Sequence, residues 1–319
     1  MSPIDGSPLV LVVPDVGDRL HRLLGDSVRL WGPAVPWPDA LGDDPRLAET
    51  RIIVCYGSTR ITAEIMDRMP KLGLICIYAS GYEGTDRAAA QARGIAVCHS
   101  PGANAPMVAD LAMGLILATV RRIAEADRVL RSDGWAAARK ARVQGLAGRV
   151  LGIWGLGAIG LEIARRAEPF GLTVLYHNRT PRPDVPYRCV DTLEALAAES
   201  DLLMVAARAG PDNRHAVNAR VLAALGPHGF VFNIARGSAI DETALIAALQ
   251  SGGIAGAGLD VFEGEPNIAP ALMACPNLVM TPHLGGNTLD SAAATDACVA
   301  ENVRAFLSEG RPRYPVPAA

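Results

Sequence analysis

The stretch VLGIWGLGAIGLEIARR, residues 150–166, carries the pattern Gly155-x-Gly157-x-x-Gly160 between an apolar run and a helical run. Gly155 permits a tight turn, Gly157 lets the backbone approach a pyrophosphate, and Gly160 lets the helix pack closely on the strand. The free N–H groups at the start of such a helix bind phosphates. The residues predicted to face a dinucleotide here are Gly155, Gly157, Ala158, Ile159 and Gly160.

The end of the next predicted strand indicates which dinucleotide is bound. A carboxylate there would bind the ribose 2′-hydroxyl of NAD, but the chain reads YHNRTPR and has no acid at this place. Asn178, Arg179 and Thr180 are therefore predicted cofactor contacts, and Arg179 and Thr180 could hold a 2′-phosphate with Arg182 nearby. This pattern predicts NADP(H) in preference to NAD(H), with NAD(H) still a candidate; a solvated loop with incidental arginines is the alternative.

Short apolar runs alternate with helical segments on both sides of the glycine motif. Examples are RIIVCYG and LGLICIYA before it, and LTVLYHNR, DLLMVAA and FVFNIARG after it. Such alternation predicts parallel β-α units, and fully apolar strands predict sheets that are covered on both faces. A long helix is expected over about Ala105 to Arg131, and an alanine-rich helix from Ser291 to Gly310.

Composition narrows the class of partner. The chain has 319 residues, of which 50% are hydrophobic and 20% charged, with a net charge of −3. Neither nucleic acid nor a membrane surface is an expected partner, since no basic block is present, and the apolar stretch MVADLAMGLILATV is interrupted by Asp110. The six cysteines are scattered without a CxxC pair, which predicts reduced thiols, no metal site and a cytoplasmic protein.

Several ordered motifs give the chain a family resemblance. SGYEGTD, the glycine motif, FNIARGSAIDETAL, GLDVFEGEP and TPHLGGNT occur in this order. With them the chain resembles the D-2-hydroxyacid dehydrogenase family, most closely its glyoxylate/hydroxypyruvate reductase and hydroxyphenylpyruvate reductase branch. The resemblance covers the chain from about Val54 to the C-terminal helix.

The resemblance implies roles for individual side chains. Arg236 would hold the substrate's carboxylate and polarise its ketone, which suits a guanidinium at the carboxyl end of a buried strand. His283 would be the general acid, with Glu265 as the carboxylate that orients it and favours its protonated form. Asp260 would bond the nicotinamide carboxamide, whereas Glu263 has no implied role and is expected to be a solvated acid. Outside this ordered set, Arg236 would be a surface arginine and His283 a structural histidine.

The resemblance also implies a substrate-binding loop and further cofactor contacts. The backbone N–H groups of Ser80 and Gly81 would face the substrate's carboxylate, with the Ser80 hydroxyl near the substrate and Tyr78 shaping the pocket. Many members carry Gly-Val-Gly where this chain has Ala79-Ser80-Gly81, which predicts a stiffer loop. The implied cofactor contacts beyond those already named are Ala207, Arg208, Ile234, Ala235, His283 and Gly285. The branch usually has proline where Arg208 stands, and a phosphate contact and a solvent-facing side chain are equally open for it.

The fold implied is α/β, with two Rossmann-like domains of parallel sheets flanked by helices and a cleft between them. Residues 1–100 with 291–319 would form the substrate-binding domain, and residues 101–290 the dinucleotide-binding domain. The arm around Gly134 to Gly148 resembles the family's dimerisation arm, so a homodimer is expected. NADPH-dependent reduction of a small 2-oxo acid to the D-2-hydroxy acid would follow.

Two other functions compete with this one. One is formate dehydrogenase, an enzyme of the same fold. In that enzyme the resemblance implies a glutamine in place of the acidic partner of the histidine, so Glu265 argues against it. A non-catalytic dinucleotide-sensing scaffold could keep the same residues.

Overall fold

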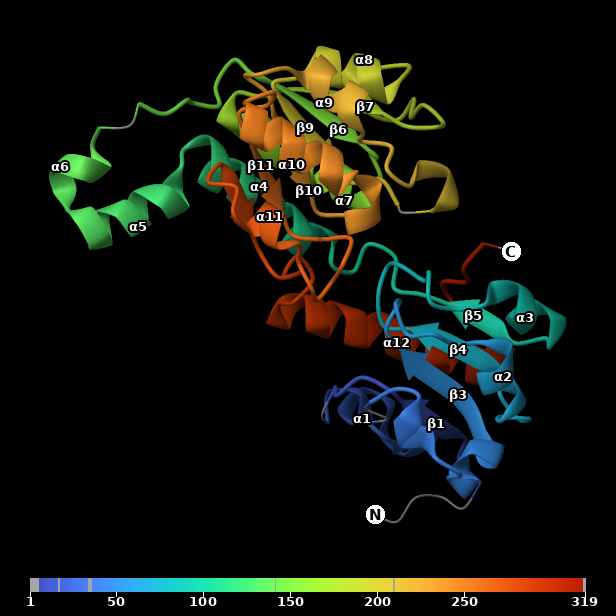
Figure 1. The fold of residues 1–319 in the computed structure, drawn as a ribbon. Helices are drawn as coiled ribbons and strands as arrows, with labels where there is room; N and C mark the ends of the chain where they lie inside the picture. Colours follow the sequence, from blue (N-terminus) through green and yellow to red (C-terminus); the bar gives the residue numbers. More distant parts are fainter. Residues whose placement is uncertain (1–5, 17, 34–35, 141, 209, 318–319) are drawn as a thin grey trace. The chain divides into compact units, whose positions relative to one another are not determined.

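The computed structural model describes residues 6–16, 18–33, 36–140, 142–208 and 210–317. It divides into two compact units, Met1–Asn104 with Leu289–Ala319, and Ala105–Thr288 (Figure 1). The first unit therefore takes its last helix from the far end of the chain.

The first unit is built on a parallel sheet of order β2-β1-β3-β4-β5. Its strands are β1 (Leu9–Val12), β2 (Arg29–Trp31), β3 (Thr50–Cys55), β4 (Leu74–Ile77) and β5 (Ala96–Cys98). Its helices are α1 (Arg19–Leu24), α2 (Ala63–Asp67), α3 (Arg87–Ala92) and α12 (Leu289–Glu309), with 3₁₀ turns η1 (Gly25–Ser27), η2 (Asp39–Leu41) and η3 (Pro45–Glu49). The strand order reverses between β1 and β3, and in open parallel sheets ligands bind at the carboxyl ends of the strands near such a reversal.

Both faces of this sheet are buried because successive side chains of a strand point to opposite sides. On β3, Ile53 and Cys55 pack with α2 and α3, whereas Ile52 and Val54 pack with α1 and α12. The tail after α12 runs antiparallel beside β5, where Pro315 forms a bridge with Cys98 (Figure 1).

The second unit carries a parallel sheet of order β12-β11-β10-β9-β6-β7-β8. Its strands are β6 (Val150–Trp154), β7 (Thr173–His177), β8 (Arg188–Cys189), β9 (Leu202–Val205), β10 (Phe230–Asn233), β11 (Gly256–Leu259) and β12 (Leu278–Met280). Its helices are α4 (Ala105–Val120), α5 (Ile123–Asp133), α6 (Trp135–Ala138), α7 (Ala158–Ala167), α8 (Leu193–Ala198), α9 (Ala219–Leu225), α10 (Glu242–Ser251) and α11 (Pro270–Met273), with 3₁₀ turns η4 (Glu168–Phe170), η5 (Pro211–Asn213) and η6 (Gly237–Ala239). The order reverses between β6 and β9. Two parallel α/β units are thus present, as the sequence predicted.

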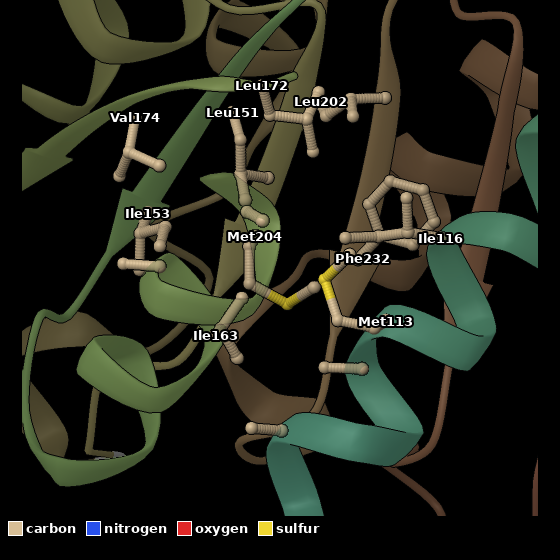
Figure 2. Close-up of a cluster of buried hydrophobic side chains, with 14 of the residues drawn as sticks. Met113, Ile116, Leu151, Ile153, Ile163, Leu172, Val174, Leu202, Met204 and Phe232 are labelled. Atoms are coloured by element: carbon tan, nitrogen blue, oxygen red, sulfur yellow. The ribbon is translucent and has the colours of Figure 1, made fainter. Parts of the chain in front are cut away.

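Alternate strand residues also cover the two faces of the second sheet. Met204 and Phe232 pack with Met113 of α4 and Ile163 of α7, as Figure 2 shows. Leu203 and its equivalents on other strands pack instead with α8, α9 and α10. Two buried faces fix the register of each strand, because a slip by one residue would exchange its two sets of side chains.

The predicted long helix over Ala105–Arg131 is wrong in one respect, since it is broken. The helix α4 ends at Val120, and Arg122 has φ 51° in the left-handed region before α5 begins. No glycine or proline marks the break, so the sequence carried no local signal for it. None of the described helices is both long and apolar enough to cross a membrane.

Candidate active site

The candidate residues of the second unit gather at one edge of its sheet. All strands are parallel, so their carboxyl ends share that edge. The residues that directly follow the strands are Gly155 after β6, Asn178 after β7, Ala206 and Ala207 after β9, Ile234 to Arg236 after β10, Asp260 after β11, and Thr281 to Gly285 after β12. Segments that are distant in the chain are thereby assembled into one row of turns.

The glycine motif forms a backbone cradle at the strand-order reversal. Gly155 has φ 99°, and a Cβ placed on it would lie 2.4 Å from Ala207 Cα on the turn after β9. A Cβ on Gly160 would lie 2.3 Å from Gly155 O, so helix and turn touch through backbone atoms. A Cβ on Gly157 meets nothing within 4 Å, so space is open at the start of α7. These features fit a dinucleotide's pyrophosphate, because a helix N-terminus and open space above it are what a phosphate needs.

Asn178 and Arg182 brace this cradle. The Leu156 N–H donates to Asn178 Oδ1 at 2.7 Å, and Arg182 donates to Leu156 O at 3.0 Å. Arg182 also pairs with Asp184, which holds the pKa of that carboxyl below its usual range. Both side chains are thus tied to the protein, and a 2′-phosphate near Arg182 stays a prediction.

Arg179 and Thr180 lie between these two residues and are both exposed. They therefore border the cradle from the end of β7, where an adenosine ribose is expected. Arg208, at the end of β9, is exposed as well. Its exposure leaves the phosphate contact and the solvent-facing interpretation both open.

The predicted contact between His283 and Glu265 is present. Their Nδ1 and Oε2 atoms lie 2.8 Å apart, and the two side chains are 49% and 35% exposed. Glu265 is held in turn by the Phe262 N–H, which donates to Oε1 at 2.8 Å. His283 has φ 54°, an unusual backbone conformation for a non-glycine residue. Because Nδ1 faces the carboxylate, Nε2 on the far side of the ring faces away from it.

Asp260 orders the turn that carries His283. It is 1% exposed, and its two oxygens accept from Thr281 Oγ1 at 2.6 Å, Leu284 N at 2.8 Å and Gly285 N at 2.9 Å. The His283 N–H donates to the Asp260 carbonyl at 2.8 Å. A buried carboxylate with three donors is satisfied by the protein itself. The nicotinamide contact of Asp260 stays a prediction, and a role in shaping the His283 turn is now evident.

The turn that carries Arg236 depends on two residues that the sequence did not single out. Asn233 is buried; its side chain accepts from Ala235 N at 3.0 Å and donates to Arg236 O at 2.9 Å. A Cβ on Gly237 would lie 1.9 Å from the Phe262 carbonyl carbon, so the turns after β10 and β11 are in direct backbone contact. A polar residue ending a buried strand and a glycine after the arginine were the available signals.

Glu263 lies at the surface, as predicted for a solvated acid, but it also has partners that the sequence did not indicate. Its side chain is 28% exposed and lies 2.9 Å from His215 Nε2, and it also pairs with Arg214. The Glu263 N–H donates to Glu242 Oε1 at 2.7 Å. These partners come from the segment after η5 and from α10, so only the fold brings them to Glu263.

In the first unit, the predicted substrate loop follows β4. The Ser80 hydroxyl lies 3.1 Å from both Ser100 O and Asn104 Oδ1, so it is bonded within the protein, and its place near a substrate stays a prediction. The Tyr78 hydroxyl donates to the buried Asp296 at 2.7 Å, and burial together with this carboxylate raises the pKa of Tyr78. Both side chains stiffen the loop.

Comparison with known families gives one match that spans more than half of the chain. The family model described as "D-isomer specific 2-hydroxyacid dehydrogenase, NAD binding domain" matches residues 113–285. This range includes the glycine cradle and the turns that carry Arg236, Glu265 and His283.

Curated relatives and solved structures match over four fifths of the chain or more. A hydroxyphenylpyruvate reductase of Plectranthus scutellarioides is 37% identical over 82% of this chain and 83% of its own. A glyoxylate reductase of Thermococcus litoralis is 36% identical over 92% of this chain and 91% of its own. The solved NADPH-dependent glyoxylate/hydroxypyruvate reductase of Sinorhizobium meliloti, in complex with NADP and malonate, is 36% identical with a TM-score of 0.86 and 98% coverage of both chains.

Proposed function

The chain belongs to the D-isomer specific 2-hydroxyacid dehydrogenase family, and from this premise we propose that it reduces a small 2-oxo acid to the D-2-hydroxy acid, with NADPH as the preferred reductant. Glyoxylate, hydroxypyruvate and an aryl pyruvate are the candidate substrates, since relatives are named for the reduction of such acids. The observation that carries the proposal is the 2.8 Å contact between His283 and Glu265, at the same sheet edge as Arg236 and the glycine cradle.

The residues divide the chemistry among them. Arg236 binds the carboxylate of the 2-oxo acid, because a guanidinium offers two parallel N–H donors to a carboxylate. His283 delivers a proton from Nε2 to the ketone oxygen, and Glu265 holds the ring through Nδ1 and stabilises its charge. In the first unit, the backbone N–H groups of Ser80 and Gly81 donate hydrogen bonds to the carboxylate of a 2-oxo acid. NADPH, when bound along the glycine cradle, supplies the hydride that reduces C2.

A substrate panel tests the activity. Purified protein is mixed with NADPH and, separately, glyoxylate, hydroxypyruvate, phenylpyruvate or hydroxyphenylpyruvate, and absorbance at the nicotinamide band is followed. We expect turnover of at least one acid, with the D-hydroxy acid as the product on a chiral column. Tight NADPH binding without turnover of any acid would instead favour the dinucleotide-sensing scaffold.

The preference for NADPH is proposed from the turn after β7. This turn offers Arg179 and Thr180 to a 2′-phosphate and has no carboxylate directly after β7 to bind the ribose 2′-hydroxyl. Each charge-assisted hydrogen bond contributes roughly 1.5–3 kcal/mol. Replacement Arg179→Ala should therefore lower kcat/KM for NADPH by about ten-fold or more and leave that for NADH nearly unchanged.

A control arginine makes this test specific. Arg188 lies on β8 and pairs with Glu199, so Arg188→Ala removes a positive charge outside the cradle. We expect its ratio of kcat/KM for the two cofactors to equal that of the unaltered protein. A higher kcat/KM for NADH than for NADPH in the unaltered protein would refute the preference.

A homodimer is proposed from the predicted arm around Gly134 to Gly148 together with the helix α5 that precedes it. Ile123 and Leu130 on α5 and Trp135 on α6 are 53%, 44% and 69% exposed, so this region carries apolar side chains without cover in one protomer. Light scattering should give twice the chain mass, and Trp135→Glu should shift it toward the monomer. Phe170→Glu is the control, since Phe170 is similarly apolar and exposed but lies outside the arm.

Cytoplasmic localisation is also proposed. All six cysteines are free, and three of them sit directly on β3, β4 and β5 as buried residues, which suits a reducing compartment. Fractionation of cells that express the protein at its natural level tests this.

A further inference from the structure

His99 is a buried histidine that the proposed chemistry does not use. It directly follows β5 and is 9% exposed. Its Nδ1 lies 2.9 Å from the backbone carbonyl oxygen of Ser80, on the loop after the neighbouring strand β4. Since a carbonyl can only accept, Nδ1 must carry the proton and donate it.

The bonded carbonyl belongs to the peptide that also contains the Gly81 N–H. In a trans peptide the C=O and the following N–H point in opposite directions. The bond from His99 to Ser80 O therefore sets the direction of the Gly81 N–H, which points away from His99. That N–H is one of the two proposed to bind the substrate's carboxylate.

Further contacts fix the position of His99 itself. Its backbone N–H donates to Tyr314 O at 3.1 Å, and its carbonyl accepts from Asn302 Nδ2 at 3.0 Å. Asn302 is fully buried on α12 and accepts from the Tyr314 N–H at 2.8 Å. The ring meets that of Tyr82 edge to face, with centroids 5.4 Å apart. A side chain held on both its backbone and its ring can impose an orientation on its partner.

The peptides on either side of the Ser80–Gly81 peptide are held by groups other than His99. The Ser100 N–H donates to Ala79 O at 3.0 Å, so the preceding peptide is bonded to the same segment. A Cβ on Gly57 would lie 2.2 Å from Gly81 O, so the next peptide packs against the end of β3. The peptide between these two is the one whose carbonyl His99 binds.

We propose that His99 is a positioning residue for substrate binding, whose Nδ1–H holds the Ser80 carbonyl and thereby aims the Gly81 N–H at the carboxylate of the 2-oxo acid. This inference rests on the proposed function, because it assigns a task within the substrate loop. Loss of the bond lets the peptide rotate, and the N–H then meets the carboxylate in only a fraction of molecules. The effect falls on the KM of the 2-oxo acid and not on the KM of NADPH.

Three substitutions at one position test this. His99→Leu removes the donor and fills its place with an apolar side chain of similar breadth. His99→Asn restores a donor, because the asparagine Nδ2 occupies the place of histidine Nδ1 relative to the backbone. His99→Gln places its donor one bond further out. Steady-state kinetics with the best acid of the substrate panel, and melting temperatures, are measured for each holoenzyme.

We expect His99→Leu and His99→Gln to raise the KM of the 2-oxo acid by about ten-fold, or ~1.4 kcal/mol, and His99→Asn to stay within about three-fold of the unaltered protein. The KM of NADPH should not change in any of them. If His99→Leu does not fold, the comparison of His99→Gln with His99→Asn gives the same test. An unchanged KM in His99→Gln or His99→Leu, or an equal rise in His99→Asn at an equal melting temperature, would overturn the positioning role alone. An unaltered protein that reduces none of the acids would overturn the proposed function first.

Discussion

Two histidine–glutamate pairs share the turn after β11, and they are built alike. Glu265 meets His283 at 2.8 Å, and Glu263 meets His215 at 2.9 Å. Both histidines have positive φ, 54° and 52°, so the backbone of each is held in an unusual conformation. Residue type and distance therefore do not distinguish the pair proposed to be catalytic from the other pair.

The pairs differ in which nitrogen is bonded. His283 uses Nδ1, so its distal Nε2 remains on the side away from the carboxylate. His215 uses Nε2 itself, and Glu263 also pairs with Arg214. A general acid must present a ring nitrogen to its substrate, and the distal one reaches furthest. His283–Glu265 therefore suits proton delivery, whereas His215–Glu263 joins two segments of the chain.

The largest effect is expected from removing the two imidazoles in turn. His283→Ala should lower kcat by a factor on the order of 10²–10⁴, because general acid catalysis contributes about that much. His215→Ala should change kcat by less than about three-fold, since the proposed chemistry does not use its ring. Steady-state kinetics of both variants at saturating NADPH checks this, and near-normal turnover by His283→Ala would disprove its assignment.

Neutralising Glu265 should lower kcat less than removal of the His283 ring does, and neutralising Glu263 should leave kcat nearly unchanged. A hydrogen bond to a charged group contributes ~1.5–3 kcal/mol, so Glu265→Gln should lower kcat by about ten- to hundred-fold. Glu263→Gln, the matched change two residues away, should leave kcat within a few-fold and lower the melting temperature instead. Equal losses of kcat in the two variants would show that the pairs do not have separate tasks.

Much of this site could be predicted from the sequence, and the limit lies in its long-range contacts. The glycine cradle is a local pattern, and the ordered motifs placed Arg236, Glu265 and His283 at strand ends. The partners of Glu263 could not be predicted, because His215 and Arg214 are 48 and 49 positions away and meet it only through the loop geometry. The side chains of Asn233 and Asp260 form hydrogen bonds with backbone groups of turns. The orientation of such backbone groups cannot be read from a sequence.

In the fold, too, the regular pattern could be predicted from the sequence, whereas a local irregularity could not. Alternating apolar strands and helices predict two parallel sheets, because burial on both faces leaves a strong pattern in composition. The break between α4 and α5 was missed because Arg122 adopts its left-handed conformation in a run of good helix formers. The proposed role of His99 could not be predicted for another reason. It rests on one hydrogen bond to a backbone carbonyl, and every residue type has such a carbonyl.

Gly237 lies where the turn after β10, which carries Arg236, touches the turn after β11, which carries Glu263 and Glu265. Its replacement should therefore lower stability more than replacement of either glutamate. In Gly237→Ala a Cβ would lie 1.9 Å from the Phe262 carbonyl carbon, and such overpacking costs ~1–3 kcal/mol. A melting temperature lower by about 2–10 °C is expected from a unit of this size. Gly114→Ala in α4 is the control, because a Cβ there meets nothing and alanine favours helix. Scanning calorimetry of the two variants would contradict the close contact if both melted alike.

The smallest effect should come from Arg214, the second partner of Glu263. Its side chain is 58% exposed, and exposed ion pairs contribute ~0.2–1 kcal/mol. Arg214→Ala should thus lower the melting temperature by at most a few degrees at low salt, and the difference should vanish near 1 M salt, where the screening length is about 3 Å. His215 is less exposed than Arg214, at 35%, and it holds Glu263 by a hydrogen bond. The loss of stability in His215→Ala should therefore persist at high salt. If both losses disappeared at high salt, the His215–Glu263 pair would be a surface charge pair and would not join the two segments.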